Sequence, residues 1–140
     1  MARDEKIDLL RTVPLFHGLG DRELERISAL ADIIDLPADR RIMSQGERGA
    51  EMFILVSGAA RVERDGAVLA DRVAGEVLGE IALLDGGPRT ATVTLTEASR
   101  LLVLARREFQ ALLDEFPAVR LHIFETVARR LRALDHEAVH

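Results

Sequence analysis

The chain has 140 residues, of which 48% are hydrophobic and 31% charged, as is usual for a globular protein. Its net charge of −5 argues against a general electrostatic footprint for nucleic acid. The lack of cysteine excludes a disulfide framework, a thiolate nucleophile and a cysteine-based zinc site. We therefore expect one domain, residues 1–140, with no bound metal and few options for catalysis.

The N-terminal sequence MARDEKIDLL lacks the basic and then apolar layout of a signal peptide. No uninterrupted apolar run exceeds five residues, which is far too short to span a bilayer. These features predict a cytoplasmic location without membrane insertion.

Residues 3–34 are predicted to form two helices, separated by a turn that contains Pro14, Gly18 and Gly20. Asp21 is in the right place to cap the second helix. In that helix, apolar residues recur at intervals of three and four, which is the helical period. They are Leu24, Ile27, Leu30, Ala31 and Ile34.

Residues 35–105 are predicted to be short strands separated by glycines, the pattern of a small barrel or sandwich. The segment EMFILVSG is too apolar to be an exposed strand, and it ends at Gly58. Asp65-Gly66 predicts a tight hairpin, because both turn residues must accept positive φ angles.

Residues 106–136 return to helix. Pro117 ends one helix and suits the first turn of the next. The last helix, about 118–136, is apolar over a wide arc and needs two surfaces to pack against. This arc is compatible with a homodimer interface or with docking to an effector domain.

The segment GEVLGEIALLDGGPRTATV, residues 75–93, carries the chemistry. A short helix after Gly79 would present free backbone N–H groups to an anion. The guanidinium of Arg89 suits a phosphate, because it can donate two parallel hydrogen bonds. A carboxylate such as Glu80 is useful there only beside a donor, for example a sugar hydroxyl. The segment therefore predicts a sugar-phosphate pocket.

The order GEIALL, DGG, PRTATV resembles the phosphate-binding cassette of the cyclic nucleotide-binding domain family. This family includes cAMP receptor proteins, kinase regulatory subunits and cyclic nucleotide-gated channels. The resemblance extends over about residues 7–135, through EMFILVSGAARV, LLVLARREFQALL and VPLFHGL. It implies an α+β, mainly β fold: an eight-stranded, jelly-roll-like β-roll with an N-terminal helical bundle and C-terminal hinge and lid helices.

The resemblance also implies roles for single residues. Glu80 would accept a hydrogen bond from the ribose 2′-OH, and Arg89 would pair with the cyclic phosphate. Backbone N–H groups near Ala82 and Ala91 would assist Arg89, and Thr90 would offer a hydroxyl to the phosphate or the purine edge. The ligand contacts expected from the cassette are Gly79, Glu80, Ile81, Ala82, Arg89, Thr90 and Ala91.

In this family the last helix closes over the base as a lid, and Arg130, Leu131 and Leu134 are the expected base contacts. The chain has no Trp or Tyr to cap a purine, so an aliphatic or arginine lid is expected. The ligand expected is cAMP, with cGMP as the alternative.

The function implied is a non-enzymatic sensor that transmits nucleotide binding through its C-terminal helices to an effector protein or fused domain. Two alternatives remain. The β-roll could serve only protein–protein contact or dimerisation, with Glu80 and Arg89 as a structural ion pair. A phosphodiesterase would need a metal site or an activated nucleophile, and neither is present in the sequence pattern. DNA binding is not expected either, because no helix-turn-helix follows the last helix.

Overall fold

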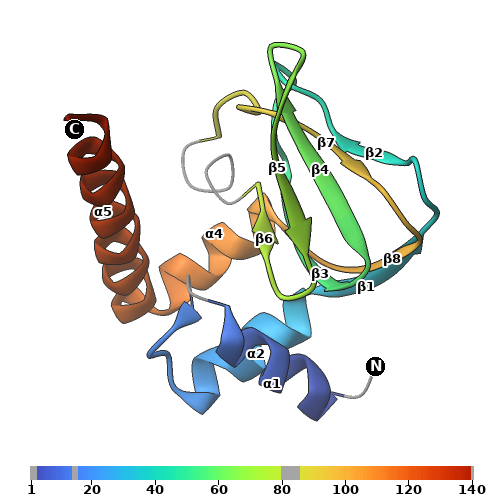
Figure 1. Ribbon diagram of the computed structural model, residues 1–140. Helices are drawn as coiled ribbons and strands as arrows, with labels where there is room; N and C mark the ends of the chain where they lie inside the picture. Colours follow the sequence, from blue (N-terminus) through green and yellow to red (C-terminus); the bar gives the residue numbers. More distant parts are fainter. Residues whose placement is uncertain (1–2, 14–15, 80–85, 140) are drawn as a thin grey trace.

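The computed structural model describes residues 3–13, 16–79 and 86–139, and Figure 1 shows their arrangement. Helices α1 (Arg3–Thr12) and α2 (Asp21–Leu30) precede the strands, and α4 (Arg106–Glu115) and α5 (Pro117–Val139) follow them. The strands are β1 (Asp32–Leu36), β2 (Arg41–Met43), β3 (Glu51–Ser57), β4 (Ala59–Arg64), β5 (Ala67–Val73), β6 (Val77–Leu78), β7 (Thr92–Leu95) and β8 (Ser99–Ala105).

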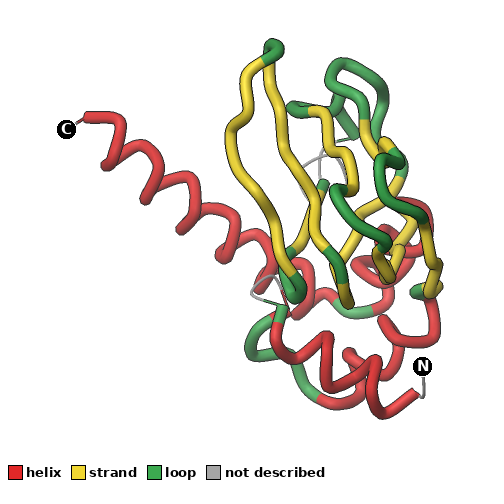
Figure 2. Tube along the Cα trace, turned by 45° about the vertical axis from the view of Figure 1, so that its right-hand side comes forward, coloured by secondary structure: helices red, strands yellow, loops and turns green. Residues whose placement is uncertain are grey.

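These strands form two four-stranded sheets, with the orders β1-β8-β3-β6 and β2-β7-β4-β5. Every strand pair is antiparallel. Helices α1, α2 and α4 lie together at one end of the strands, and α5 extends away from them (Figures 1 and 2). The expected α+β architecture, a β-roll of eight strands with helices before and after it, is confirmed.

Strands β3 and β8 are the centre of the fold, because both of their faces are buried. On one face, Ile54 and Leu102 pack with the helices in the larger hydrophobic cluster. On the other face, Leu55 and Leu101 pack inside the β-roll. Successive side chains of a strand point to opposite faces, so a strand covered on both sides reads as one continuous apolar run. This explains the run EMFILVS at β3.

The predicted hairpin joins β4 to β5, and Asp65 and Gly66 have φ angles of 53° and 81°. A side chain from outside the hairpin holds its tip. Gln45 donates from Nε2 to Asp65 Oδ1 (2.8 Å), and its Oε1 accepts from the Asp65 N–H (2.9 Å). The Gln45 N–H in turn donates to Thr92 Oγ1 on β7 (3.0 Å). The hairpin tip is therefore fixed to the neighbouring loop.

Two expectations about the N-terminal helices were wrong. α2 ends at Leu30, not near residue 34, because Ile33 and Ile34 pair with β8 as part of β1. β-branched residues fit a pleated sheet well, and sheet pairing prevails over the helical spacing here. Asp21 does not cap α2: Gly20 holds the N-cap position without a side-chain bond, and the Asp21 carboxylate accepts from Arg11 instead.

The two C-terminal helices differ in packing: α4 buries Phe109 and Leu112 in the core, whereas α5 extends away from it (Figure 1). α5 starts at Pro117, as predicted, and buries Val119 and Ile123 in its first turns. Beyond them it projects away from the strands in both views (Figures 1 and 2). Leu121 and Phe124 are 62% and 76% exposed. Over the described ranges, no helix has the length and apolar character needed to cross a membrane.

Candidate functional site

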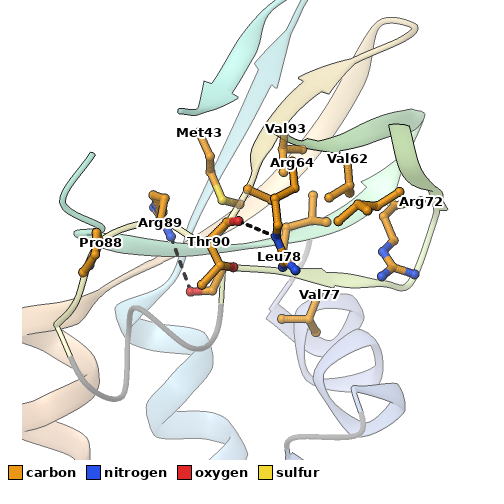
Figure 3. A pocket seen from close by; sticks show the side chains of 13 residues that line it. Met43, Val62, Arg64, Arg72, Val77, Leu78, Pro88, Arg89, Thr90 and Val93 are labelled. Atoms are coloured by element: carbon orange, nitrogen blue, oxygen red, sulfur yellow. Dashed lines mark hydrogen bonds between the residues drawn. The ribbon is translucent and has the colours of Figure 1, made fainter. Parts of the chain in front are cut away.

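A cavity of about 200 Å³ opens between the β4–β5 hairpin, strand β6 and the segment 88–91 (Figure 3). Four of the residues expected from the cassette are in its wall: Gly79, Arg89, Thr90 and Ala91. The other described lining residues are Met43, Val62, Arg64, Leu69, Arg72, Val77, Leu78, Pro88 and Val93. The cavity thus combines an apolar lining with three guanidinium groups.

Arg89 is the buried charge of this site, with only 6% of the residue exposed. Its Nη2 donates to the backbone oxygen of Glu51 (2.7 Å), and its Nη1 donates to that of Gly79 (3.4 Å; Figure 3 shows the second bond). The Glu51 carboxylate is 3.8 Å from Nη2 and is 40% exposed. Burial lowers the pKa of Arg89, and the charge of Glu51 partly opposes that shift. A guanidinium still remains protonated in proteins, so a positive charge lies at the cavity wall.

The backbone of Arg89 is held as firmly as its side chain. The Arg89 N–H donates to the Glu47 carbonyl (2.7 Å), and the Arg89 carbonyl accepts from the Gly46 N–H (2.9 Å). Pro88 forms an isolated bridge with Arg48 next to these bonds. The backbone from which the guanidinium extends is therefore fixed, which limits the positions that the guanidinium can take.

Gly79 is required beside Arg89 for two reasons. Its φ angle is +84°, a conformation that glycine adopts without strain. A Cβ atom at this position would collide with Arg89 Nη1 and lie 3.0 Å from the terminal methyl carbon of Met43. Among the described residues, the groups that lie closest to Gly79 are therefore the guanidinium of Arg89 and the end of the Met43 side chain.

Some expected contacts fall outside the described part of the chain. Glu80, Ile81 and Ala82, together with the short helix expected after Gly79, lie in the segment 80–85. Arg130, Leu131 and Leu134 belong to α5, but their side chains are not among those described. Their contacts with a nucleotide stay predictions.

Sequence reasoning did not find the part of the wall that the hairpin supplies. Val62 and Arg64, two residues apart on β4, both line the cavity, and alternation along a strand could have revealed this pair. On β5 the signal is absent. Leu69 and Arg72 both line the cavity although they are three residues apart, because a bulge shifts the register there.

Among the described residues, no group of three or more His, Asp or Glu side chains could hold a metal ion. The site offers cationic donors, small residues and an apolar wall.

A family model for the cyclic nucleotide-binding domain matches residues 33–116, which include every strand except the first residue of β1. The match extends over more than half of the chain and contains the whole segment around Arg89. The chain belongs to the cyclic nucleotide-binding domain family.

Characterised relatives agree with this assignment. The chain is 34% identical over 132 residues to the Cyclic AMP receptor protein of Thermus thermophilus, covering 89% of this chain and 60% of that protein. It is 34% identical over 113 residues to the Pycsar effector protein XpPycTIR of Xanthomonas perforans, covering 80% and 37%. The chain therefore spans less than two thirds of either relative.

The fold is also similar to that of a solved structure of matching length. This is the N-terminal domain of a transcriptional regulator from Streptomyces coelicolor A3(2), with a TM-score of 0.82 and 32% sequence identity. The similarity covers 93% of this chain and 94% of that one.

We predict that Gly79→Ala destabilises the protein more than Gly75→Ala. Both glycines have positive φ angles, +84° and +93°, so each alanine carries a similar backbone strain of about 1 kcal/mol. At Gly75 nothing lies within 4 Å of the added carbon, whereas at Gly79 the carbon meets Arg89. Urea unfolding of the two variants measures the difference, and equal losses would mean that Arg89 is not held against Gly79.

Proposed function

We propose that this chain is a sensor module that binds a purine 3′,5′-cyclic nucleotide at the Arg89 cavity and performs no catalysis itself. The observation that carries the proposal is the buried guanidinium of Arg89. Among the described residues it donates to two neutral carbonyl oxygens, and the nearby carboxylate is half-exposed at 3.8 Å. A buried charge with such weak compensation is costly, and a phosphate in the cavity would supply the missing countercharge.

The cyclic phosphate would bind at Arg89, with the backbone of Ala91 and of the expected helix at Ala82 nearby. Glu80 would accept from the ribose 2′-OH, the hydroxyl that a 3′,5′-cyclic phosphate leaves free. The base would then point toward the hairpin wall of Val62 and Leu69, which supplies apolar surface. The name of the Thermus relative supports cAMP as the ligand.

We predict that Arg89→Ala and Glu80→Ala each weaken cAMP binding at least tenfold, because each removes a charge-assisted hydrogen bond of ~1.5–3 kcal/mol. Titration calorimetry of cAMP and cGMP on the wild type and both variants measures this. Arg61→Ala is the matched control, since Arg61 is an exposed arginine of β4 outside the cavity lining. A wild type with no detectable heat for either nucleotide would contradict the proposal.

The bonds of Arg89 also suggest how binding would reach the C-terminal helices. Arg89 Nη2 bonds to the Glu51 carbonyl, and the carbonyl of the preceding residue, Ala50, accepts from the N–H of Arg106, the first residue of α4 (2.8 Å). Adjacent carbonyls thus join the phosphate-binding arginine to the start of α4. A ligand that moves the guanidinium of Arg89 would shift residues 50–51 and, through the Ala50 bond, the start of α4.

A second contact runs in parallel through the Arg106 side chain. A Cβ atom on Gly86 would lie 2.6 Å from Arg106 Nη2, so the guanidinium lies directly on the Gly86 backbone. The Arg106 Nε is buried and has no hydrogen-bond partner among the described residues. The side chain is therefore held by packing between α4 and the end of the cassette.

We predict that Arg106→Ala changes nucleotide affinity by less than about threefold but reduces the response of the C-terminal helices to the ligand. The Ala50 bond survives because it uses the backbone, whereas the packing on Gly86 is lost. Hydrogen–deuterium exchange of α4 and α5 with and without cAMP measures the response. The control is Arg107→Ala, an exposed neighbour on α4. An undiminished response in Arg106→Ala would refute this route.

A second candidate function, self-association, rests on α5. Its first turns bury Val119 and Ile123, yet Leu121 and Phe124 on the same turns are 62% and 76% exposed. A helix with apolar residues on two faces needs a second surface to cover it. A second copy of this chain, with the same faces exposed, is the partner proposed, and the dimer would form through the C-terminal helix.

We predict that the wild type is a dimer at micromolar concentration and that Phe124→Glu is a monomer, because a charge at this position would be buried in the interface. Light scattering coupled to size-exclusion chromatography measures the mass. Glu125→Gln, a change at an exposed neighbour, is the control. A monomeric wild type would rule out this interface.

A further inference from the structure

The wall of the cavity holds more positive charge than one cyclic phosphate requires. Three of the described lining residues are arginines, Arg64, Arg72 and Arg89. No described lining residue is acidic. Arg89 is the buried one, next to Gly79, and suffices for a single negative charge. The other two come from the hairpin, on the side where the base would lie. Arg64 and Arg72 would therefore contact acceptor atoms of the ligand other than the phosphate oxygens.

Arg64 is aimed at this part of the cavity by a hydrogen bond. Its Nε donates to the carbonyl oxygen of Thr90 (2.9 Å), and Figure 3 shows its side chain reaching from β4 to that bond. The bond uses one of the five N–H groups of the guanidinium and fixes the plane of the rest. Arg64 is exposed, so its remaining donors can reach a ligand in the open cavity.

Hydrogen bonds hold the residues on both sides of Arg64's contact. Arg64 directly precedes Asp65 at the hairpin tip, which Gln45 holds by two hydrogen bonds. Thr90, its acceptor, follows Arg89, whose backbone is fixed by the loop at 46–47. The guanidinium of Arg64 is therefore held in position although the residue is exposed.

Arg72 differs from Arg64 in its partner. Its Nε lies 3.5 Å from Glu76 Oε2, which compensates its charge within the protein. Among the described residues, the partner of Arg64 is the neutral carbonyl of Thr90. The positive charge of Arg64 is therefore compensated less than that of Arg72 and is available to a ligand in the cavity.

A guanidinium with two free parallel donors matches the acceptor pair O6 and N7 on one edge of guanine. Adenine presents N7 beside an amino group, which is a donor and opposes an arginine. We propose that Arg64 is a specificity-determining residue that contacts the O6/N7 edge of a guanine base, so that the cavity accepts cGMP in addition to cAMP. This proposal rests on the proposed function, because it places a cyclic nucleotide in the same cavity.

The test measures the dissociation constants of cAMP, cGMP and cyclic inosine monophosphate for the wild type, Arg64→Gln and Arg64→Lys. Inosine keeps O6 and N7 but lacks the 2-amino group, so it isolates the edge in question. We expect Arg64→Gln to weaken cGMP and the inosine nucleotide about tenfold relative to cAMP. Arg64→Lys keeps the charge but loses the fork of donors, so the same preference should fall.

The matched control is Arg61→Gln, which removes the same charge from the same strand outside the cavity lining. It should leave the ratio of the affinities unchanged. A ratio that is unchanged in both Arg64 variants, or that changes equally in Arg61→Gln, would overturn the role of Arg64 while leaving the proposed function intact. A wild type that binds none of the three nucleotides would overturn both.

Discussion

The burial of one positive charge is the constraint on which the site depends. Arg89 is almost fully buried and so has lost most of its contact with water. Among the described residues, two carbonyl oxygens accept its hydrogen bonds and one carboxylate lies 3.8 Å away. Each surrounding feature can be understood from this charge. Gly79 lacks a side chain where the guanidinium lies, the loop at 46–47 fixes its backbone, and the segment at 50–51 accepts its hydrogen bond and borders α4. A net charge of −5 is compatible with such a site, because the positive potential is local.

The frame that carries Arg89 is made by the two strands covered on both faces. One face of β3 and β8 meets the helices and the other meets the interior of the β-roll. Glu51, whose carbonyl oxygen accepts a hydrogen bond from Arg89, is the first residue of β3. β8 continues into α4 without an intervening residue, from Ala105 to Arg106. The Arg89 side chain, through its bond to Glu51, and the C-terminal helices are thus both attached to these two strands.

Much of the fold and part of the site could be predicted from local patterns. The hairpin at Asp65-Gly66, the helix start at Pro117 and the common cavity of Gly79, Arg89, Thr90 and Ala91 follow from residues close in sequence. The end of α2 could not, because Ile33 and Ile34 suit either period and only pairing with β8 decides between them. Nor could the hydrogen bond of Arg64 be predicted, since its acceptor is 26 residues away, or the place of Leu69 in the cavity wall, which follows from a bulge.

The length of α5 would enlarge any tilt at the start of this helix. With 23 residues at about 1.5 Å each, the helix is roughly 35 Å long. Val119 and Ile123 are buried and Val127 packs partly against the same cluster, and the helix extends clear of the strands beyond them (Figure 1). From Val127 to Val139 the helix extends about 18 Å, so a tilt of about 10° at Val127 would carry the far end through about 3 Å. A tilt that leaves the buried start of the helix almost in place would therefore still move its far end.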